Sequence, residues 1–393
     1  MPPRRTLAAP LAAEALAAAK LIAAELATVE LADASLRGSS GVWLLVHELG
    51  ADAPAVPRAA VRRWEAAAIA ALAVQGASFF EGMLGAAWLL ALLGRAPGEL
   101  AAVDEAVLDV LHGRWDGGLA AFGGGLAGFG SYGLARMHTR AGRRVVRRCV
   151  ARFGELAHRD GSSAWWTPGT AARSEAPRDQ APALWNREGT AAAVGFLAAA
   201  RGAARSALPL ARRGARTLAV QLARASHDRI GVATLHAAPG LVHGSGTWAL
   251  GGAGAVGALL AVAHATRDFE AAARCGRMLA DLDPAACAAS DASLGTGTAG
   301  IACVMQALAE ATNRRVFAFA AEHWHRRTLR CRRSGEGIGG YLHVDALANV
   351  AVGGGRWAPR PGLLEGAAGT ALSLVCAARG TRASPWFARC LLA

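Results

Sequence analysis

Residues 362–372 read GLLEGAAGTAL, with two glycines three residues apart, a glutamate before the first and an apolar run behind the second. This pattern predicts a helix that starts at the glycine pair, because helix-forming residues follow it without interruption. Similar elements recur along the chain, so an internal repeat is the strongest organising signal. The copies read EGMLG at 81–85, GLAG at 125–128, EGTAA at 188–192, GGAG at 251–254 and GTAG at 297–300.

The spacing of these elements predicts helical hairpins. Their first glycines stand at positions 82, 125, 189, 251, 297 and 366, so neighbouring copies lie 43 to 69 residues apart, which suits two helices and their loops. A glycine at a helix start lets the backbone turn sharply and lets helices approach closely. We therefore expect an all-α (α/α)6 toroid, a double-layered barrel of six helical hairpins, rather than a generic helical bundle. Charged segments such as EHWHRR at 322–327 belong to the outer layer.

We expect a single toroid domain over residues 1–393. Residues 1–75 form its N-terminal helical part. Residues 160–183 are interpreted as a loop or insertion, because this stretch carries Pro168, Pro177 and Pro182 among small polar residues.

The composition excludes several classes of protein. Hydrophobic residues make up 53% and mean hydropathy is +0.26, so a disordered chain is excluded. Seven cysteines without any CxxC do not form a disulfide framework, and we expect a cytoplasmic protein. Two uncharged runs, 117–135 and 241–265, are rich in glycine, and we interpret them as buried helices rather than membrane spans. No secretory signal is evident.

The chain is strongly basic, with a net charge of +13, and Lys20 is its only lysine. Arginines cluster at 143–148, 212–213 and 326–333. Three interpretations stay open: solvated outer helices, a face for an acidic peptide, or a face for nucleic acid. We expect a peptide partner and no nucleic acid.

Several segments resemble the lanthionine synthetase C-like (LanC-like) family. No single motif is specific, but their order and spacing together are, over roughly residues 75 to 385. The repeats at 79–85 and 125–132 take part in the resemblance. The strongest stretches are 293–299, 317–324, 327–330, 334–341 and 362–372.

The resemblance implies an α/α toroid that helps to make thioether-bridged peptides. Family enzymes add a cysteine thiol of a precursor peptide to a dehydroalanine or dehydrobutyrine. A zinc ion lowers the pKa of the thiol, so that the thiolate nucleophile exists at neutral pH. The zinc ligands come from a Trp-Cys-Tyr-Gly and a Cys-His-Gly motif, and an Ala-His-Gly motif supplies an acid/base histidine. The implied partners are a precursor peptide with an acidic leader and a dehydratase or kinase/lyase enzyme.

The chain departs from the family at these motifs. Residues 248–251 read WALG and residues 294–297 read LGTG, so the three ligand positions hold Ala249, Gly295 and Thr296. Alanine, glycine and threonine do not make a three-ligand zinc site, so we predict no metal and no cofactor. The histidine motif aligns with Glu188, which we predict as a general acid/base.

Other residues complete the predicted site. His236, in LHAAPG at 235–240, resembles a displaced histidine motif and is a second catalytic candidate, although it also suits an ordinary loop histidine. We predict five binding residues. For two of them, both glutamates, attraction to the positive end of a helix is a sufficient structural explanation. A metal site rebuilt from His236, His243 and Cys287 stays an alternative. The binding candidates are Glu81, His243, Trp248, Thr296 and Glu365.

Three functions compete. The first is a zinc-independent cyclase that relies on holding the thiol and the dehydroamino acid together. The second is a non-catalytic protein of the same fold that binds a peptide or an enzyme. The third is an unrelated (α/α)6 glycosidase, which needs paired carboxylates in its cavity.

Overall fold

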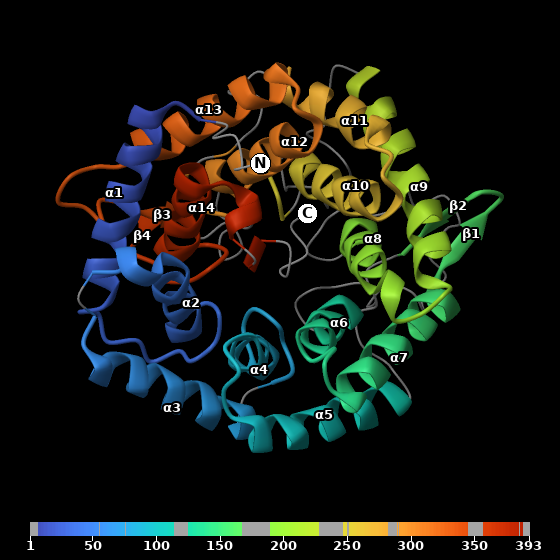
Figure 1. Ribbon diagram of the computed structural model, residues 1–393, viewed down its shortest axis with the longest axis horizontal. Helices are drawn as coiled ribbons and strands as arrows, with labels where there is room; N and C mark the ends of the chain where they lie inside the picture. The colour runs from blue at the N-terminus through green and yellow to red at the C-terminus, as the bar shows by residue number, and fades with distance from the viewer. Residues whose placement is uncertain are drawn as a thin grey trace.

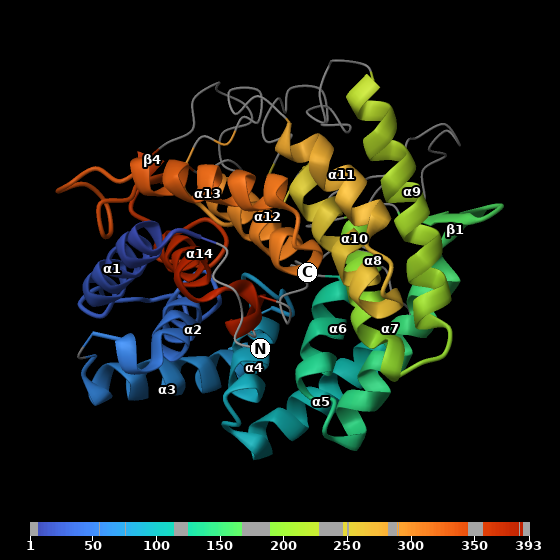
Figure 2. The same ribbon diagram turned by 45° about the horizontal axis from the view of Figure 1, so that its top comes forward.

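The computed structural model describes residues 7–54, 56–74, 76–113, 125–166, 189–227, 247–249, 251–281, 289, 291–344, 357–384 and 386–387. Within these ranges the chain forms fourteen α-helices in two concentric layers, shown in Figure 1 and again in the tilted view of Figure 2. The inner layer consists of α2 (Ser39–Leu49), α4 (Met83–Leu92), α6 (Leu126–Ala135), α8 (Thr190–Ala199), α10 (Gly252–Thr266), α12 (Thr298–Thr312) and α14 (Ala367–Arg379). The outer layer consists of α1 (Ala9–Leu26), α3 (Arg58–Val74), α5 (Pro97–His112), α7 (Arg140–Leu156), α9 (Ala207–His227), α11 (Glu270–Ala280) and α13 (Arg315–Arg330).

The inner layer closes on itself. Each inner helix packs against the next, from α2 through α14 and back to α2 (Figure 1). Two short antiparallel ladders are also present: β1 (His158–Asp160) with β2 (Ser163–Trp165), and β3 (His343–Val344) with β4 (Trp357–Ala358). Three 3-10 helices follow α2, α8 and α14: η1 (Gly50–Asp52), η2 (Ala200–Gly202) and η4 (Thr381–Ala383). The expected insertion at 160–183 begins in the first ladder, and most of it lies outside the described residues.

The two layers differ in the way their helices are buried. In α8 every residue from Thr190 to Ala198 is buried, as expected for a helix that is apolar all round. In α7 the buried side chains, among them Val145, Cys149 and Phe153, follow a helical spacing on one face. The core therefore lies between the layers, and α7 turns its arginines outward. None of the helices in the described ranges is long and apolar enough to cross a membrane.

The glycine repeat marks the start of the inner helices. Each of the six first glycines is the residue that precedes an inner helix, with extended backbone. The second glycine of the element stands three residues after the first, within the first turn of the helix. In four inner helices the preceding loop folds back over this turn and contacts that glycine. A Cβ on Gly369 would overlap the carbonyl oxygen of Leu363, and a Cβ on Gly300 would overlap that of Leu294. A Cβ on Gly85 would likewise overlap the carbonyl oxygen of Phe79, and a Cβ on Gly41 would overlap that of Leu36. Close packing therefore requires glycine at these four places.

The ring has one hairpin more than the repeat count predicts. The toroid itself is present, but α1 and α2 form a seventh hairpin within the N-terminal helical part. Helix α2 begins after Gly38 and carries Gly41 three residues later, so it bears the same element as the other inner helices. The prediction of six hairpins omitted it, because RGSSG at 37–41 shares only its glycines with the other copies.

A buried polar contact links the outer helix α13 to the inner helix α12. His325 on α13 is fully buried, and its Nε2 lies 2.8 Å from the Gln306 Oε1 on α12. Burial lowers the pKa of His325 to about 3, so this imidazole is neutral in the folded protein.

Candidate functional site

The loops before four inner helices are tied together at one end of the ring. The amide of Ala249 donates to the Gly295 carbonyl at 2.8 Å, and the amide of Gly295 donates to the Leu364 carbonyl at 2.7 Å. The amide of Leu363 donates to the Leu36 carbonyl at 2.8 Å. These backbone bonds join the loops before α10, α12, α14 and α2 in their order around the axis. We call this N-terminal end of the inner layer the mouth.

The predicted ligand positions lie together in the mouth. Ala249 and Gly295 are hydrogen-bonded neighbours, and Thr296 follows directly. The Thr296 hydroxyl lies 3.2 Å from the Ser293 hydroxyl, so it takes part in a local turn. A methyl group, a bare backbone and a bonded hydroxyl do not fit a zinc ion. Within the described ranges, no group of three or more His, Cys, Asp or Glu side chains is placed to hold a metal.

Several predicted residues lie outside the described part of the chain. They are Glu188, His236 and His243, together with Cys287 of the alternative metal site. Their catalytic, binding and metal-binding roles therefore stay predictions.

An arginine joins the two predicted glutamates of the mouth. Arg37 Nη1 lies 3.1 Å from Glu81 Oε1, and Arg37 Nη2 lies 3.8 Å from Glu365 Oε2. Arg360 approaches the same Glu365 oxygen at 3.8 Å. The sequence prediction named both glutamates but missed both arginines. The side chains of Arg37 and Glu81 are 41% and 43% exposed, so this cluster is reachable from solvent.

The charged cluster follows a register position of the repeat. Arg37, Glu81, Thr296 and Glu365 each stand immediately before the glycine that caps an inner helix. Glu188 has the same place in the sequence before Gly189. In these described hairpins the repeat thus sets a polar or charged side chain immediately before the capping glycine.

Trp248 has a different environment from the one expected of a binding residue. It is only 1% exposed, and its ring packs edge-on against Phe80 with centroids 6.4 Å apart. The observed contacts are those of a core residue that supports the mouth from below. A direct role of Trp248 in binding stays a prediction.

A buried polar set lies behind the mouth, and the sequence prediction missed it. The Asp291 carboxylate accepts hydrogen bonds from the Ser293 hydroxyl at 2.7 Å and from the Val344 amide at 2.9 Å. His343 Nε2 lies 3.0 Å from the Thr370 Oγ1, in the first turn of α14. Burial lowers the pKa of His343 to about 4, although the charge of Asp291 opposes the shift. The signal for Asp291 was its DAS turn pattern at 291–293, which favours such local bonds.

The arrangement gives the mouth a limited chemistry. Arg37 offers a permanently charged hydrogen-bond donor to a peptide carbonyl or carboxylate. His343 is buried, and Glu365 is 11% exposed beside two arginines. Among the described side chains of the mouth, Arg37 and Glu81 are therefore charged groups that solvent reaches.

No protein-family model matches the sequence, and no curated protein matches it either. Among solved structures, the chain is similar to "Nisin cyclase", with a TM-score of 0.65 and 14% identity over 96% of each chain. The match confirms the all-α toroid, and it confirms the resemblance to the LanC-like family in the fold. At this identity it shows the fold alone.

Proposed function

We propose that this chain is a zinc-independent cyclase of modified-peptide maturation. It adds a cysteine thiol of a precursor peptide to a dehydroalanine or dehydrobutyrine and forms a thioether. The fold shared with nisin cyclase supports this proposal. The observation that carries it is the tied mouth, where the backbone frame persists around Ala249, Gly295 and Thr296 without metal ligands.

The reaction needs little from the protein beyond position. The thiolate sulfur bonds to the β-carbon of the dehydroamino acid, the double-bond electrons move toward the α-carbon and its carbonyl, and a proton then joins the α-carbon. An ordinary cysteine thiol has a pKa of about 8.5, so a few per cent is thiolate at pH 7. Holding both ends of the peptide in the mouth lowers the barrier by several kcal/mol through proximity alone.

Arg37 and the predicted acid/base residues have separate roles in this proposal. The Arg37 guanidinium, half exposed at the mouth, donates hydrogen bonds to the enolate oxygen as charge develops there. A guanidinium does not release its proton at neutral pH, so Arg37 is not the proton donor. Glu188 or His236, or a water molecule, supplies that proton.

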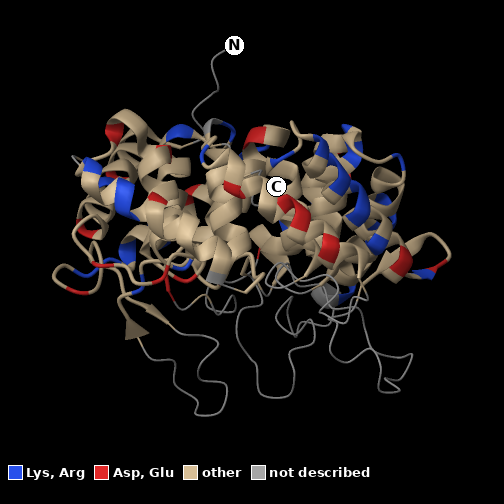
Figure 3. Cartoon of the chain, turned by 90° about the horizontal axis from the view of Figure 1, so that it is seen from below, with Lys and Arg blue, Asp and Glu red and all other residues tan. Residues whose placement is uncertain are grey.

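An acidic leader has a complementary surface on the outer layer. Helices α7 and α9 together carry one acidic residue, Glu155, among many arginines. Figure 3 shows basic residues gathered on this side of the ring. Several of these arginines are exposed, and we call them the arginine wall: Arg143, Arg144, Arg147, Arg212, Arg213 and Arg216. Attraction to an acidic leader at this wall weakens with added salt.

A cytoplasmic setting belongs to the same proposal. The described cysteines 149, 275, 303, 331 and 376 are free thiols, which suits a reducing compartment where substrate thiols also persist.

The test is a cyclisation assay with a peptide that carries one cysteine and one dehydroalanine. Free thiol is trapped by alkylation and counted by mass spectrometry, with and without a zinc chelator. We expect acceleration over the peptide alone, no effect of the chelator, and a rate that rises roughly fifteenfold from pH 7 to 8.5 with the thiolate fraction. Arg37→Gln is expected to slow the reaction, whereas Arg95→Gln is not. Arg95 is a matched control because it pairs with Glu65 at 3.7 Å just after the C-terminal end of α4.

The second candidate is a non-catalytic protein that binds the precursor peptide or a dehydratase or kinase/lyase enzyme. The ion pairs that engage Glu81 and Glu365 with Arg37 favour it, because they leave the described mouth without a free acid. Binding of the peptide without acceleration would support this candidate over the cyclase. Loss of activity with the chelator would overturn the zinc-independent mechanism.

The glycosidase alternative is not favoured by the geometry. It needs two carboxylates that face a substrate from opposite sides. In the described mouth Glu81 and Glu365 instead share one arginine.

A further inference from the structure

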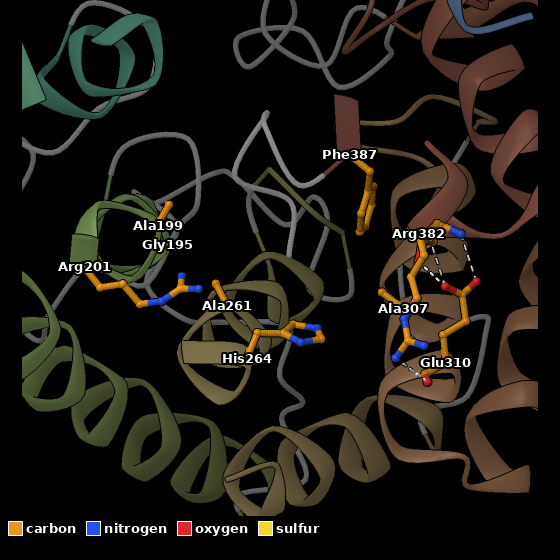
Figure 4. A pocket seen from close by; sticks show the side chains of 10 residues that line it. Gly195, Ala199, Arg201, Ala261, His264, Ala307, Glu310, Arg382 and Phe387 are labelled. Carbon is orange, nitrogen blue, oxygen red and sulfur yellow. Dashed lines mark hydrogen bonds between the residues drawn. The ribbon is translucent and has the colours of Figure 1, made fainter. Parts of the chain in front are cut away.

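A cavity of about 340 Å³ lies at the end of the inner layer opposite the mouth. It is lined from α8, α10 and α12 near their C-terminal ends and from the turn after α14 (Figure 4). Helix α12 has 15 residues, which places this end about 22 Å from the mouth at 1.5 Å per residue. We propose that this cavity is a binding site for a small molecule or chain end that joins one carboxylate to an apolar body.

The floor of the cavity is apolar and built from small residues. Gly195, Ala199, Ala261 and Ala307 line it from three inner helices, and Phe387 covers one side. Larger side chains at these places would fill the space, as they do elsewhere in the closely packed core. The small residues therefore leave room for a few carbon atoms of a ligand.

The rim carries positive charge from two opposite sides. In Figure 4 Arg201 and Arg382 approach from opposite walls, with His264 between them. In the described part of the chain, neither arginine forms an ion pair with a carboxylate. Arg382 Nη2 donates to the Glu310 backbone carbonyl at 3.0 Å, and Arg201 Nη1 donates to the Ala198 carbonyl at 3.4 Å. Two like charges that face one cavity favour an anion between them.

The one carboxylate among the described residues of the rim, Glu310, is already engaged. Glu310 Oε1 accepts from the Thr381 amide at 2.9 Å and from Gln306 Nε2 at 3.2 Å. Its Oε2 accepts from the Thr381 hydroxyl at 2.6 Å and from the Arg382 amide at 3.2 Å. Glu310 thus fixes the turn that presents Arg382 and does not neutralise the guanidinium groups through a direct ion pair.

Attraction to helix ends explains only part of this arrangement. Arg201 and His264 stand at the C-terminal ends of their helices, where positive charge is favourable. That attraction requires neither the cavity nor the small residues of its floor. The partial negative charge of the helix ends also repels an anion, so the carboxylate is held by the guanidinium groups at the rim and the apolar body enters the floor.

His264 contributes a neutral hydrogen-bonding group. Partial burial lowers the pKa of His264, and the nearby Arg382 and Arg201 lower it further. Around neutral pH its imidazole is therefore uncharged and can donate one hydrogen bond to the ligand. A carboxylate with two arginines and one imidazole around it has a full set of donors.

Two sources have the required chemistry: a free carboxylic acid and the C-terminal carboxylate of a peptide with an apolar last residue. Titration calorimetry with hexanoate and with N-acetyl-leucine distinguishes them, and hexanamide and N-acetyl-leucinamide are the neutral controls. We expect at least one acid to bind, and its amide to bind at least tenfold more weakly. The tighter of the two acids identifies the source.

Three variants test the site itself. Arg201→Gln should weaken binding about tenfold, and Ala261→Leu should abolish it by filling the floor. Arg63→Gln, at an exposed position of the outer helix α3, should leave binding unchanged and is the matched control for charge. Equal binding of acid and amide, equal effects of Arg201→Gln and Arg63→Gln, or no binding of either acid would overturn the proposal. Arg201 is exposed, so its variant remains informative if Ala261→Leu fails to fold. These experiments measure ligand binding and do not measure thioether formation, so a failure of the proposed cyclase activity would not change their outcome.

Discussion

The two ends of the inner layer are built on different principles. At the mouth, loops are joined by backbone hydrogen bonds and capped by glycines, and the predicted ligand positions hold Ala249, Gly295 and Thr296. At the opposite end, the Glu310 side chain accepts a hydrogen bond from the Thr381 hydroxyl, and the Arg382 side chain donates one to the Glu310 carbonyl, so the turn after α14 is joined to α12. The mouth therefore has a fixed backbone frame whose cluster of Arg37, Glu81 and Glu365 is ion-paired, whereas the opposite end has a cavity rimmed by charge.

The two ends therefore differ in which residues tolerate substitution. A residue whose Cβ would overlap a carbonyl oxygen cannot vary without disturbing the ring. A side chain immediately before a capping glycine can vary, because it projects from the loop and not into the core. Positions of this kind hold Arg37, Glu81, Thr296 and Glu365 in turn, while the backbone frame around them is kept.

The largest expected effect is a loss of stability in mild acid, to which two buried histidines contribute. His343 and His325 have pKa values of about 4 and about 3 when folded, below the ordinary 6.5. As pH falls from 6.5 to 4, the unfolded chain binds protons that the folded chain excludes. The free energy of unfolding then falls by up to about 1.4 kcal/mol per pH unit for each histidine.

Urea unfolding at pH 7, 5.5 and 4.5 measures this slope. His343→Asn and His325→Gln should each reduce it, whatever their effect at pH 7. A slope that is the same in both variants as in the natural protein would contradict the assignment of these two buried imidazoles.

A methyl group in the frame of the mouth is expected to cost about 3 kcal/mol. In Gly369→Ala the new Cβ would overlap the Leu363 carbonyl oxygen, so the loop before α14 must move. Gly154→Ala is the matched control, because it lies in the outer helix α7 with no atom within 4 Å of its Cβ position. That control should gain about 0.5 to 1 kcal/mol from helix propensity. Chemical denaturation of both variants checks the contrast, and a Gly369→Ala protein as stable as its parent would break it.

At the opposite end, Glu310→Gln is expected to cost about 2 kcal/mol, since hydrogen bonds to a charged group are each worth more than neutral ones. The amide keeps the shape but replaces one accepting oxygen with a donor. One of the two hydrogen bonds that the Thr381 amide and hydroxyl donate to the carboxylate is then lost, and the other is weakened. Thermal unfolding measures the loss. An unchanged midpoint would show that the turn after α14 is held by other contacts.

The smallest expected effect on stability is that of Arg37→Gln, below about 1 kcal/mol, because ion pairs between half-exposed side chains are weak. Arg95→Gln should change stability by a similarly small amount. The two variants are expected to differ in peptide cyclisation and not in unfolding. A large stability loss for Arg37→Gln alone would make this arginine part of the frame.

Much of the fold could be predicted from the sequence, because the glycine elements are local. Six of them mark the starts of inner helices, and the apolar runs behind them mark the inner layer. The seventh hairpin carried the same signal at Gly38 and Gly41, followed by Val42 and Trp43, but its polar serines concealed it.

The site could be predicted less well, because its contacts join residues far apart in the chain. Arg37 meets Glu365 only after the ring closes, and nothing in the sequence near either residue indicates the pair. The cavity at the opposite end depends on alanines in three helices and on a turn, and alanine is common throughout this chain. Positions defined by the repeat were predictable, whereas partners defined by closure of the ring were not.

The most direct test of the central claim is to restore the three ligand side chains and measure metal. The Ala249→Cys, Gly295→Cys, Thr296→His triple variant places two thiols and an imidazole in the tied mouth, where a Cβ at position 295 meets the Leu364 carbonyl oxygen no closer than 3.2 Å. Metal content after dialysis, and cobalt absorption bands typical of thiolate ligands, should show about one ion per chain in the triple variant and almost none in the parent. A parent protein that retains one zinc ion per chain, or a folded triple variant that binds none, would contradict the account of a preserved mouth that has lost its ligands.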